Sequence, residues 1–153
     1  MNNYPNGVDV VWIGLDNKEY IAAFITAGIA PIPNFVIQNK MVLIEDIEEI
    51  VLKINKSSDV FLNVAIPKPN IFLELSKRGL YVYDWTDVEK KSTAQKNAYE
   101  LVATPSIPLH YYSLKDTNLK EYLENIKFDL VDFKTNIFID VKQYLVCLKS
   151  KDS

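Results

Sequence analysis

The sequence predicts an α+β fold, in which a mixed, mainly antiparallel sheet carries three or four short helices. Two runs rich in β-branched and aromatic residues, 8–15 and 20–27, open the chain, and similar strand-like runs recur towards its end. Between them, the stretch 43–54 places its apolar residues at the 3.6-residue period of a helix. Strands and short helices that follow one another without long linkers are typical of a layered domain with one core.

Length and composition favour a single domain over residues 1–153, with its core at about 8–149. A chain of 153 residues has the ordinary size of one domain, and two halves would each be difficult to stabilise. Hydrophobic residues make up 48% of the chain and charged residues 24%, which is the balance of an average globular protein. We therefore expect one sizeable hydrophobic core.

The first element is predicted to be a β-hairpin. Its two strands, 8–15 and 20–27, are separated by the polar residues 16–19. Apolar side chains occupy both faces of the first strand, so we expect both faces to be covered. Two prolines in 28–34 then predict an extended loop, because proline fixes its own φ and restricts the residue before it.

The clearest helix spans 43–54. Its apolar residues form one stripe that faces the core, namely Leu43, Ile44, Ile47, Ile50, Val51 and Ile54. The charged residues between them face outward, namely Glu45, Asp46, Glu48, Glu49 and Lys53. Like charges this close repel one another, although the helix dipole favours acidic residues near the N-terminus.

A strand, a helix and a second strand follow at 60–66, 70–78 and 80–85. Pro69 is well placed to open the helix, and Gly79 to end it in a left-handed conformation. This order is compatible with a right-handed crossover. A capping box in the polar stretch that follows supports at most one or two helical turns in 87–97. The remaining expected elements are extended segments at 98–104 and 109–114, a short helix at 119–126, and two or three strands around 130–134, 136–141 and 144–148.

The residues that most enzymes and metal proteins require are scarce in this sequence. His110 is the only histidine, Cys147 the only cysteine, and the four glycines are too far apart for a phosphate-binding loop. The sequence has no Gly-x-Ser-x-Gly motif and no calcium-loop or zinc-site spacing. We therefore expect no cofactor, no metal and no enzymatic activity, with His110 structural or on the surface and Cys147 a small buried hydrophobe.

Charge and hydropathy narrow the class of partner. The formal net charge is −3 and the lysines are scattered, so direct binding of nucleic acid is not expected. No apolar run approaches the ~20 residues that span a bilayer, and no basic and apolar leader opens the chain. We expect a cytoplasmic protein that does not enter membranes.

Two features suggest a surface that binds another protein. The first is the acidic helix face formed by Glu45, Asp46, Glu48 and Glu49, which can attract a basic partner or can simply reflect the helix dipole and solubility. The second is the strand end that contains Asp84, Trp85 and Asp87. Among the nine tyrosines, most are expected to pack in the core.

Several segments resemble a family of small bacterial immunity proteins, the partners of polymorphic toxins that are delivered by contact-dependent growth inhibition. The resemblance is carried by VWIGLD at 11–16, AFITAG at 23–28, PIP at 31–33, RGLYVYDWTDV at 78–88 and AYELVATP at 98–105. It implies stoichiometric binding of a cognate protein toxin, at its active site or beside it. Many such toxins are nucleases with basic clefts, so an acidic helix would imitate a phosphate backbone. The resemblance assigns no contact residues, and those named above follow from residue chemistry alone.

Two other hypotheses stay open. A non-enzymatic regulatory or scaffold module would use similar surfaces for a different partner. A small enzyme using carboxylates, centred on Asp84, Asp87 and Glu89, is the third and least favoured hypothesis. It would require a deep pocket in which burial raises the pKa of one carboxyl group.

Overall fold

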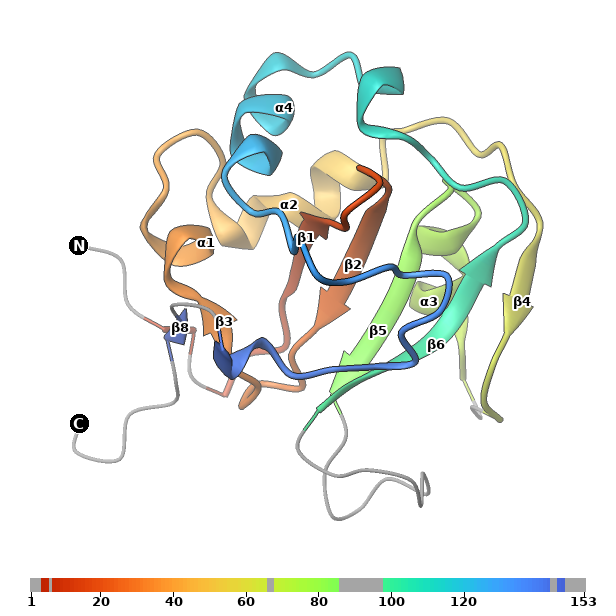
Figure 1. The fold of residues 1–153 in the computed structure, drawn as a ribbon, viewed down its shortest axis with the longest axis horizontal. Coiled ribbons are helices and arrows are strands. Elements are labelled where there is room, and N and C mark those ends of the chain that lie inside the picture. Colours follow the sequence, from red (N-terminus) through yellow and green to blue (C-terminus); the bar gives the residue numbers. More distant parts are fainter. Residues whose placement is uncertain (1–3, 6, 66–67, 86–97, 144–145, 148–153) are drawn as a thin grey trace.

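The computed structural model describes residues 4–5, 7–65, 68–85, 98–143 and 146–147, and it confirms the predicted α+β fold. The sheet has the order β1-β2-β5-β6-β4, and the short strand β7 also pairs with β6 (Figure 1). Only β2 and β5 run parallel, and all other neighbours in this sheet are antiparallel. Its strands are β1 (Val11–Leu15), β2 (Ile21–Ile25), β4 (Val60–Leu62), β5 (Tyr81–Trp85), β6 (Tyr99–Pro105) and β7 (Phe138–Ile139).

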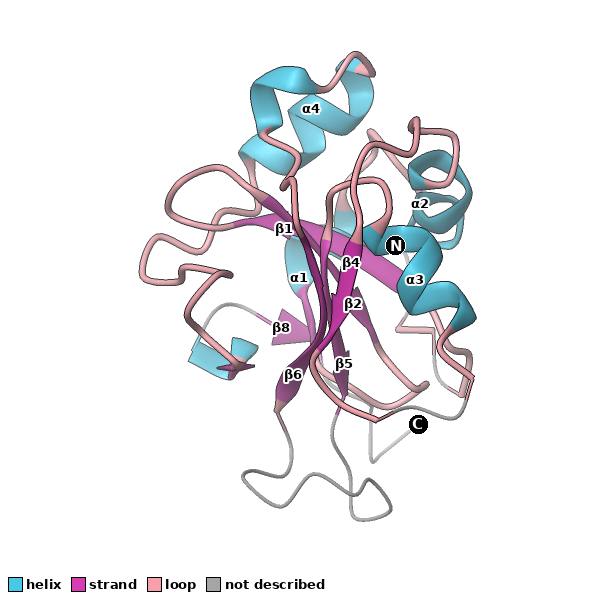
Figure 2. Ribbon diagram, turned by 90° about the vertical axis from the view of Figure 1, so that its right-hand side faces the viewer, coloured by secondary structure: helices cyan, strands magenta, loops and turns pink. Residues whose placement is uncertain are grey.

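Four α-helices lie within the described part of the chain. They are α1 (Asn34–Gln38), α2 (Ile44–Val51), α3 (Asn70–Ser76) and α4 (Thr117–Glu124). Figure 2 shows α2 and α3 on the same side of the sheet, where α2 packs on β1 and α3 packs on β5 and β6. Smaller elements complete the fold, namely the two-stranded sheet of β3 (Ile32–Pro33) and β8 (Val146–Cys147) and the 3-10 helices η1 (Tyr111–Ser113) and η2 (Val141–Gln143).

Aromatic side chains form the centre of the core. Trp12 stacks on its cross-strand neighbour Phe24 at 4.1 Å between ring centroids, and Phe24 in turn stacks on Tyr83 at 5.2 Å. The buried polar atoms of these rings have partners, since the Trp12 indole donates to the Tyr99 hydroxyl at 3.1 Å. Gly14 allows Phe128 to join the cluster, because a Cβ at position 14 would lie 3.1 Å from that ring. Both faces of β1 are buried, as the sequence predicts.

The predicted hairpin, the helix at α2 and the helix ended by Gly79 are all found, and Gly79 has a φ of +94°. The crossover differs in one respect. Strands β4 and β5 both run antiparallel to β6, so they are parallel to each other, but β6 lies between them. The helix from β4 to β5 therefore crosses over a third strand. Segment 87–97 lies outside the described residues.

Two predictions of extended structure are wrong. Segment 109–114 contains the 3-10 helix η1, because the imidazole Nδ1 of His110 accepts a hydrogen bond from the Tyr112 N–H and stabilises a turn. Segment 130–134 forms turns in place of a strand, since Asp132 accepts hydrogen bonds from the backbone of Lys134 and the 135–136 region. The loop predicted at 28–34 is also partly regular, because it includes β3 and the start of α1.

Candidate functional site

The four acidic residues of α2 lie together on the outer side of the helix, and we call them the acidic surface (Glu45, Asp46, Glu48 and Glu49). Glu45, Asp46 and Glu49 are exposed and Glu48 is half-buried. The opposite side of α2 is buried in the core through Ile44, Ile47 and Val51. The helical periodicity thus sorts the side chains within α2 as predicted, but Leu43, which was expected in the apolar stripe, precedes the helix and is 47% exposed, and Ile54 lies beyond its end.

Contacts before the helix fix the position at which it begins. The buried side chain of Asn39 accepts hydrogen bonds from the N–H groups of Met41 at 3.0 Å and Val42 at 2.9 Å. Its amide donates to the carbonyl of Val36 at 2.7 Å, within α1. This one residue therefore orders the connection between α1 and α2. The helix has no side-chain N-cap, so Glu45 and Asp46 of its first turn supply the negative charge that the dipole favours.

An arginine from the turn that follows α3 holds the other end. The Arg78 guanidinium is largely buried and donates from Nε at 3.1 Å and from Nη2 at 2.9 Å to the Leu52 carbonyl, directly after α2. That carbonyl is one of those that a helix C-terminus leaves unpaired. The acidic surface is consequently carried by a short helix that is fixed at both ends and along its buried side.

The carboxylates of the acidic surface have little neutralising charge around them. Among the described residues, the one ion pair is that of Lys53 with Glu49, at a long 3.9 Å between Nζ and Oε1. An open groove of about 570 Å³ lies on this side of the helix, lined by Glu45, Glu48, Glu49, Leu52 and Lys53. The arrangement offers several carboxylate oxygens to a basic group from outside, with an aliphatic side chain among them.

The second predicted surface lies elsewhere and is mostly buried. Asp84 and Trp85 belong to β5, two strands away from the β1 strand that carries α2. Only 8% of Asp84 and 6% of Trp85 are exposed, and the Trp85 ring packs edge-on against Tyr99 at 5.3 Å. Asp87 lies outside the described residues. The structure therefore does not bring Asp84 and Trp85 together with the acidic surface, and it leaves these two side chains little area for a partner.

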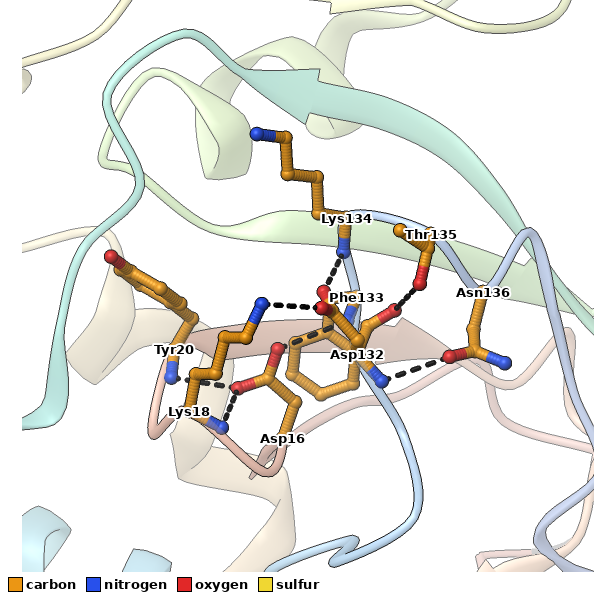
Figure 3. A network of polar contacts seen from close by, with 8 residues as sticks. All are labelled: Asp16, Lys18, Tyr20, Asp132, Phe133, Lys134, Thr135 and Asn136. Carbon is orange, nitrogen blue, oxygen red and sulfur yellow. Dashed lines mark hydrogen bonds and ion pairs between the residues drawn. The ribbon is translucent and has the colours of Figure 1, made fainter.

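A polar network that was not expected from the sequence joins the first hairpin to segment 132–136 (Figure 3). Asp16 is fully buried, and its carboxylate accepts three backbone hydrogen bonds, from Lys18 and Tyr20 at 3.0 Å each and from Phe133 at 3.0 Å. The ammonium of Lys18 contacts Asp132 at 2.8 Å. This hydrogen bond lowers the pKa of Asp132 and raises the pKa of Lys18.

The network has a structural role, because it connects two segments that lie far apart in the sequence. The three hydrogen bonds to the Asp16 carboxylate all come from backbone N–H groups, so both of its oxygens are occupied within the fold. An aspartate that opens a four-residue turn predicts the bonds to Lys18 and Tyr20. No local pattern predicts the bond from Phe133, because that residue lies 117 positions further along the chain.

His110 also has a structural arrangement. Its Nε2 lies 2.9 Å from the carbonyl of Lys18, and its Nδ1 accepts from the N–H of Tyr112 at 3.2 Å. The two contacts match the imidazole tautomer in which Nε2 donates to the Lys18 carbonyl and Nδ1 accepts from Tyr112. The ring packs between Tyr20 and Tyr112, with centroid distances of 5.3 Å and 5.2 Å. Both ring nitrogens are thus occupied by backbone groups.

Metal sites and membrane-spanning helices are both absent from the described part of the chain. No three of its His, Cys, Asp and Glu side chains are grouped so as to hold a metal ion. None of its helices combines the length and the apolar character needed to cross a bilayer. The side chain of Cys147 is not among the described features. Comparisons of the chain with models of protein families, with curated proteins and with solved structures gave no match.

Proposed function

We propose that this protein is an immunity protein, which binds a cognate toxin stoichiometrically in the cytoplasm and thereby blocks it. The observation that carries the proposal is the acidic surface of α2, four carboxylates that a single distant lysine partly neutralises. Crowded like charges lower the stability of a helix by a few tenths of a kcal/mol for each pair. The helix dipole favours Glu45 and Asp46 in the first turn, but it does not remove the repulsion among the four carboxylates, and a basic partner would.

The fixed position of α2 supports the same conclusion. Asn39 and Arg78 hold the two ends of the helix, and Ile47 and Val51 hold its inner side. A partner that docks on the acidic surface therefore has little backbone motion to arrest, which reduces the entropic cost of association. The carboxylates also repeat along the helix at about one turn, ~5.4 Å, and so present a row of negative groups.

A nuclease is the class of toxin that fits this row best. Enzymes that bind nucleic acid use lysine and arginine to contact phosphates, and the acidic surface would occupy such a cleft in place of the substrate. Opposite charges would also raise the rate of association. A tight complex buries about 1,600 Å², so elements next to α2 would contribute to the interface as well.

A regulatory or scaffold module is the alternative, because it would use the same surface for another basic protein. The identity of the partner separates the two functions. An enzyme based on Asp84, Asp87 and Glu89 has less support, since Asp84 is buried in β5 and the groove of the acidic surface is open. Asp87 and Glu89 lie outside the described residues.

The gene for the toxin is expected directly upstream of the gene for this protein. The test is to express that upstream gene with and without this protein. A toxin that arrests growth alone, is harmless in the presence of this protein, and co-purifies with it in a 1:1 complex would support the proposal. Rescue should be weakened by the double variant Glu45→Lys/Glu49→Lys. The control variant Glu121→Lys/Asp129→Lys makes the same change in net charge at other exposed positions and should rescue fully. If the protein neither rescues growth nor forms a complex, the proposal is contradicted. If the Glu45→Lys/Glu49→Lys variant still rescues fully, the interface does not lie on α2.

A further inference from the structure

Strand β4 forms an edge of the sheet whose backbone is open to pairing (Figure 1). In its antiparallel pair with β6, the Ser106 N–H donates to the Asp59 carbonyl at 2.9 Å, and the Asn63 N–H donates to the Val102 carbonyl at 2.9 Å. Hydrogen-bonded positions alternate in such a pair. The N–H and C=O groups of Val60 and Leu62 therefore point away from β6, and no described residue bonds to them.

The opposite edge of the sheet is closed. The Leu15 N–H of β1 donates to the Ile126 carbonyl at 2.9 Å, and the Leu15 carbonyl accepts from Phe128 at 2.8 Å. The Ile13 carbonyl accepts from the Tyr122 hydroxyl of α4 at 2.7 Å. The segment after α4 thus covers one edge, whereas no described residue pairs with the other.

The residues of β4 do not protect it against pairing. Natural proteins commonly guard an edge strand by keeping it very short or by placing a lysine, a proline or an inward-pointing charge on it. Strand β4 is short, with three residues, but its sequence Val60-Phe61-Leu62 contains none of the protective residue types. Phe61 is 68% exposed, while Val60 and Leu62 pack against the core from the other face. An added strand would cover Phe61 and give partners to the free backbone groups.

The surface at the N-terminal end of β4 indicates the charge of such a strand. A shallow groove of about 560 Å³ lies there, with Lys56 and Lys77 beside the apolar side chains of Val60, Leu73 and Ile107. Both lysines share a single carboxylate, that of Glu74, at 3.4 Å each, and Arg78 contacts the same group at 3.2 Å. Because Arg78, which does not line the groove, also pairs with Glu74, that carboxylate does not fully neutralise the two lysines, and Asp59 is the one acidic residue in the groove lining.

We infer that the β4 edge binds an extended peptide segment as an added antiparallel strand, with an acidic residue or a terminal carboxylate at the C-terminal end of that strand lying against Lys56 and Lys77. The direction follows from geometry, because an antiparallel strand ends beside the start of β4, where the groove lies. Antiparallel pairs are also the commoner kind. The occupant is a protein segment, since only a backbone offers the matching donors and acceptors. This site is separate from the acidic surface and has the opposite charge, so it does not depend on the proposed function.

The test titrates the isotope-labelled protein with two acetylated, amidated peptides, TVTVTEE and TVTVTKK, and follows the amide resonances by NMR. The acidic peptide should shift the amides of Val60 and Leu62 and those around the groove, with a Kd of about 1 mM or tighter. The basic peptide should bind at least ~5-fold more weakly, because it meets like charges at the groove. Methylating the peptide amides that face β4 should abolish the shifts, which tests strand pairing without altering the protein.

Two variants separate charge from pairing. Lys56→Gln/Lys77→Gln should remove the preference for the acidic peptide, whereas the control Lys115→Gln/Lys134→Gln, at exposed positions elsewhere, should keep it. Val60→Pro deletes an outward N–H to which no described residue bonds, and it should weaken binding more than the control Val60→Ala, which loses the same core contacts but keeps the N–H. Equal binding of both peptides, shifts centred on another surface, or no shift at about 2 mM peptide would each overturn the inference. Concentration-dependent pairing of β4 with a second copy of the chain would also overturn it.

Discussion

Exchanging Glu45 and Glu49 for lysine inverts the charge of the acidic surface while leaving the buried side of α2 untouched. Both side chains are exposed, and the core contacts of the helix are made by Ile47 and Val51. The four carboxylates and Lys53 together carry a formal charge of about −3, which the double variant changes to about +1. A basic partner would then meet repulsion where it met attraction.

The size of the effect follows from the exposure of these groups. An exposed ion pair contributes about 0.2–1 kcal/mol, and each reversal replaces such an attraction by a repulsion of similar size. Two reversals should therefore weaken binding by roughly 1–4 kcal/mol, or about 5- to 1,000-fold in Kd. Because charges act on approaching partners over a distance, the association rate should fall by about 10- to 100-fold at low salt.

The assay is the association rate of the toxin with immobilised protein, measured at two ionic strengths. At about 1 M salt the Debye length shrinks to ~3 Å, so the rates of the variant and the unaltered protein should converge. The control variant Glu121→Lys/Asp129→Lys makes the same change in net charge on another surface and should associate almost normally. Equal slowing by both variants would refute the reasoning, because it would show an effect of overall charge with no local site. A cation at position 45 opposes the helix dipole at a cost of about 0.3–1 kcal/mol, so Tm should fall by no more than about 4 °C.

Three further predictions concern the fold. Gly79→Ala should lower stability by about 2 kcal/mol or more, because φ is +94° and the new Cβ would lie 2.8 Å from the backbone nitrogen of Leu109. Gly7→Ala should lower it by only about 1 kcal/mol, because φ is +76° but the space around the new Cβ is open. Chemical denaturation measures both losses, and equal losses would contradict the packing argument. Asp16→Asn should lower stability by about 1–3 kcal/mol, because a carboxylate with three N–H donors loses an acceptor oxygen, and an unchanged Tm would show that the network is dispensable. Burial raises the phenol pKa of several tyrosines, that of Tyr81 to about 12, and so keeps these side chains neutral. The stability that this neutral burial contributes is therefore full below pH ~10, the pKa of a free tyrosine, and falls as the pH rises above it. An absorbance titration should show the buried tyrosines ionising only as the protein unfolds. Ionisation of every tyrosine near pH 10 in a folded protein would contradict the burial of the set Tyr81, Tyr83, Tyr99 and Tyr122.

Local patterns carried enough information to predict much of the fold. The apolar period of α2, the β-branched and aromatic runs of the first hairpin and the glycine after α3 each reflect short-range physics, and each element is found where it was expected. The wrong strand at 109–114 has a different origin. There the backbone is directed by one imidazole that bonds to the N–H of Tyr112 and to the carbonyl of Lys18, and the second contact spans 92 residues.

The candidate site also contains residues whose exposure a local pattern predicts and residues whose exposure depends on long-range packing. Helical periodicity places Glu45 and Glu49 in solvent, as predicted, because one side of an amphipathic helix must face the core. The exposure of Asp84 and Trp85 depends on what covers β5, and sequence spacing does not contain that information. Strand order also comes from long-range pairing. The sequence therefore does not predict that β6 lies between β4 and β5 and leaves β4 at the edge of the sheet.

The most direct test of the account is carboxylate labelling of the protein, free and in complex with the product of the neighbouring gene, the proposed toxin. Carbodiimide and an amine probe modify exposed carboxylates, and mass spectrometry counts the label at each position. We expect Glu45, Asp46 and Glu49 to lose most of their label in the complex, while Glu121 and Asp129 keep theirs. Unchanged labelling of α2 in a complex that still blocks the toxin would contradict the central claim that the acidic surface makes the contact.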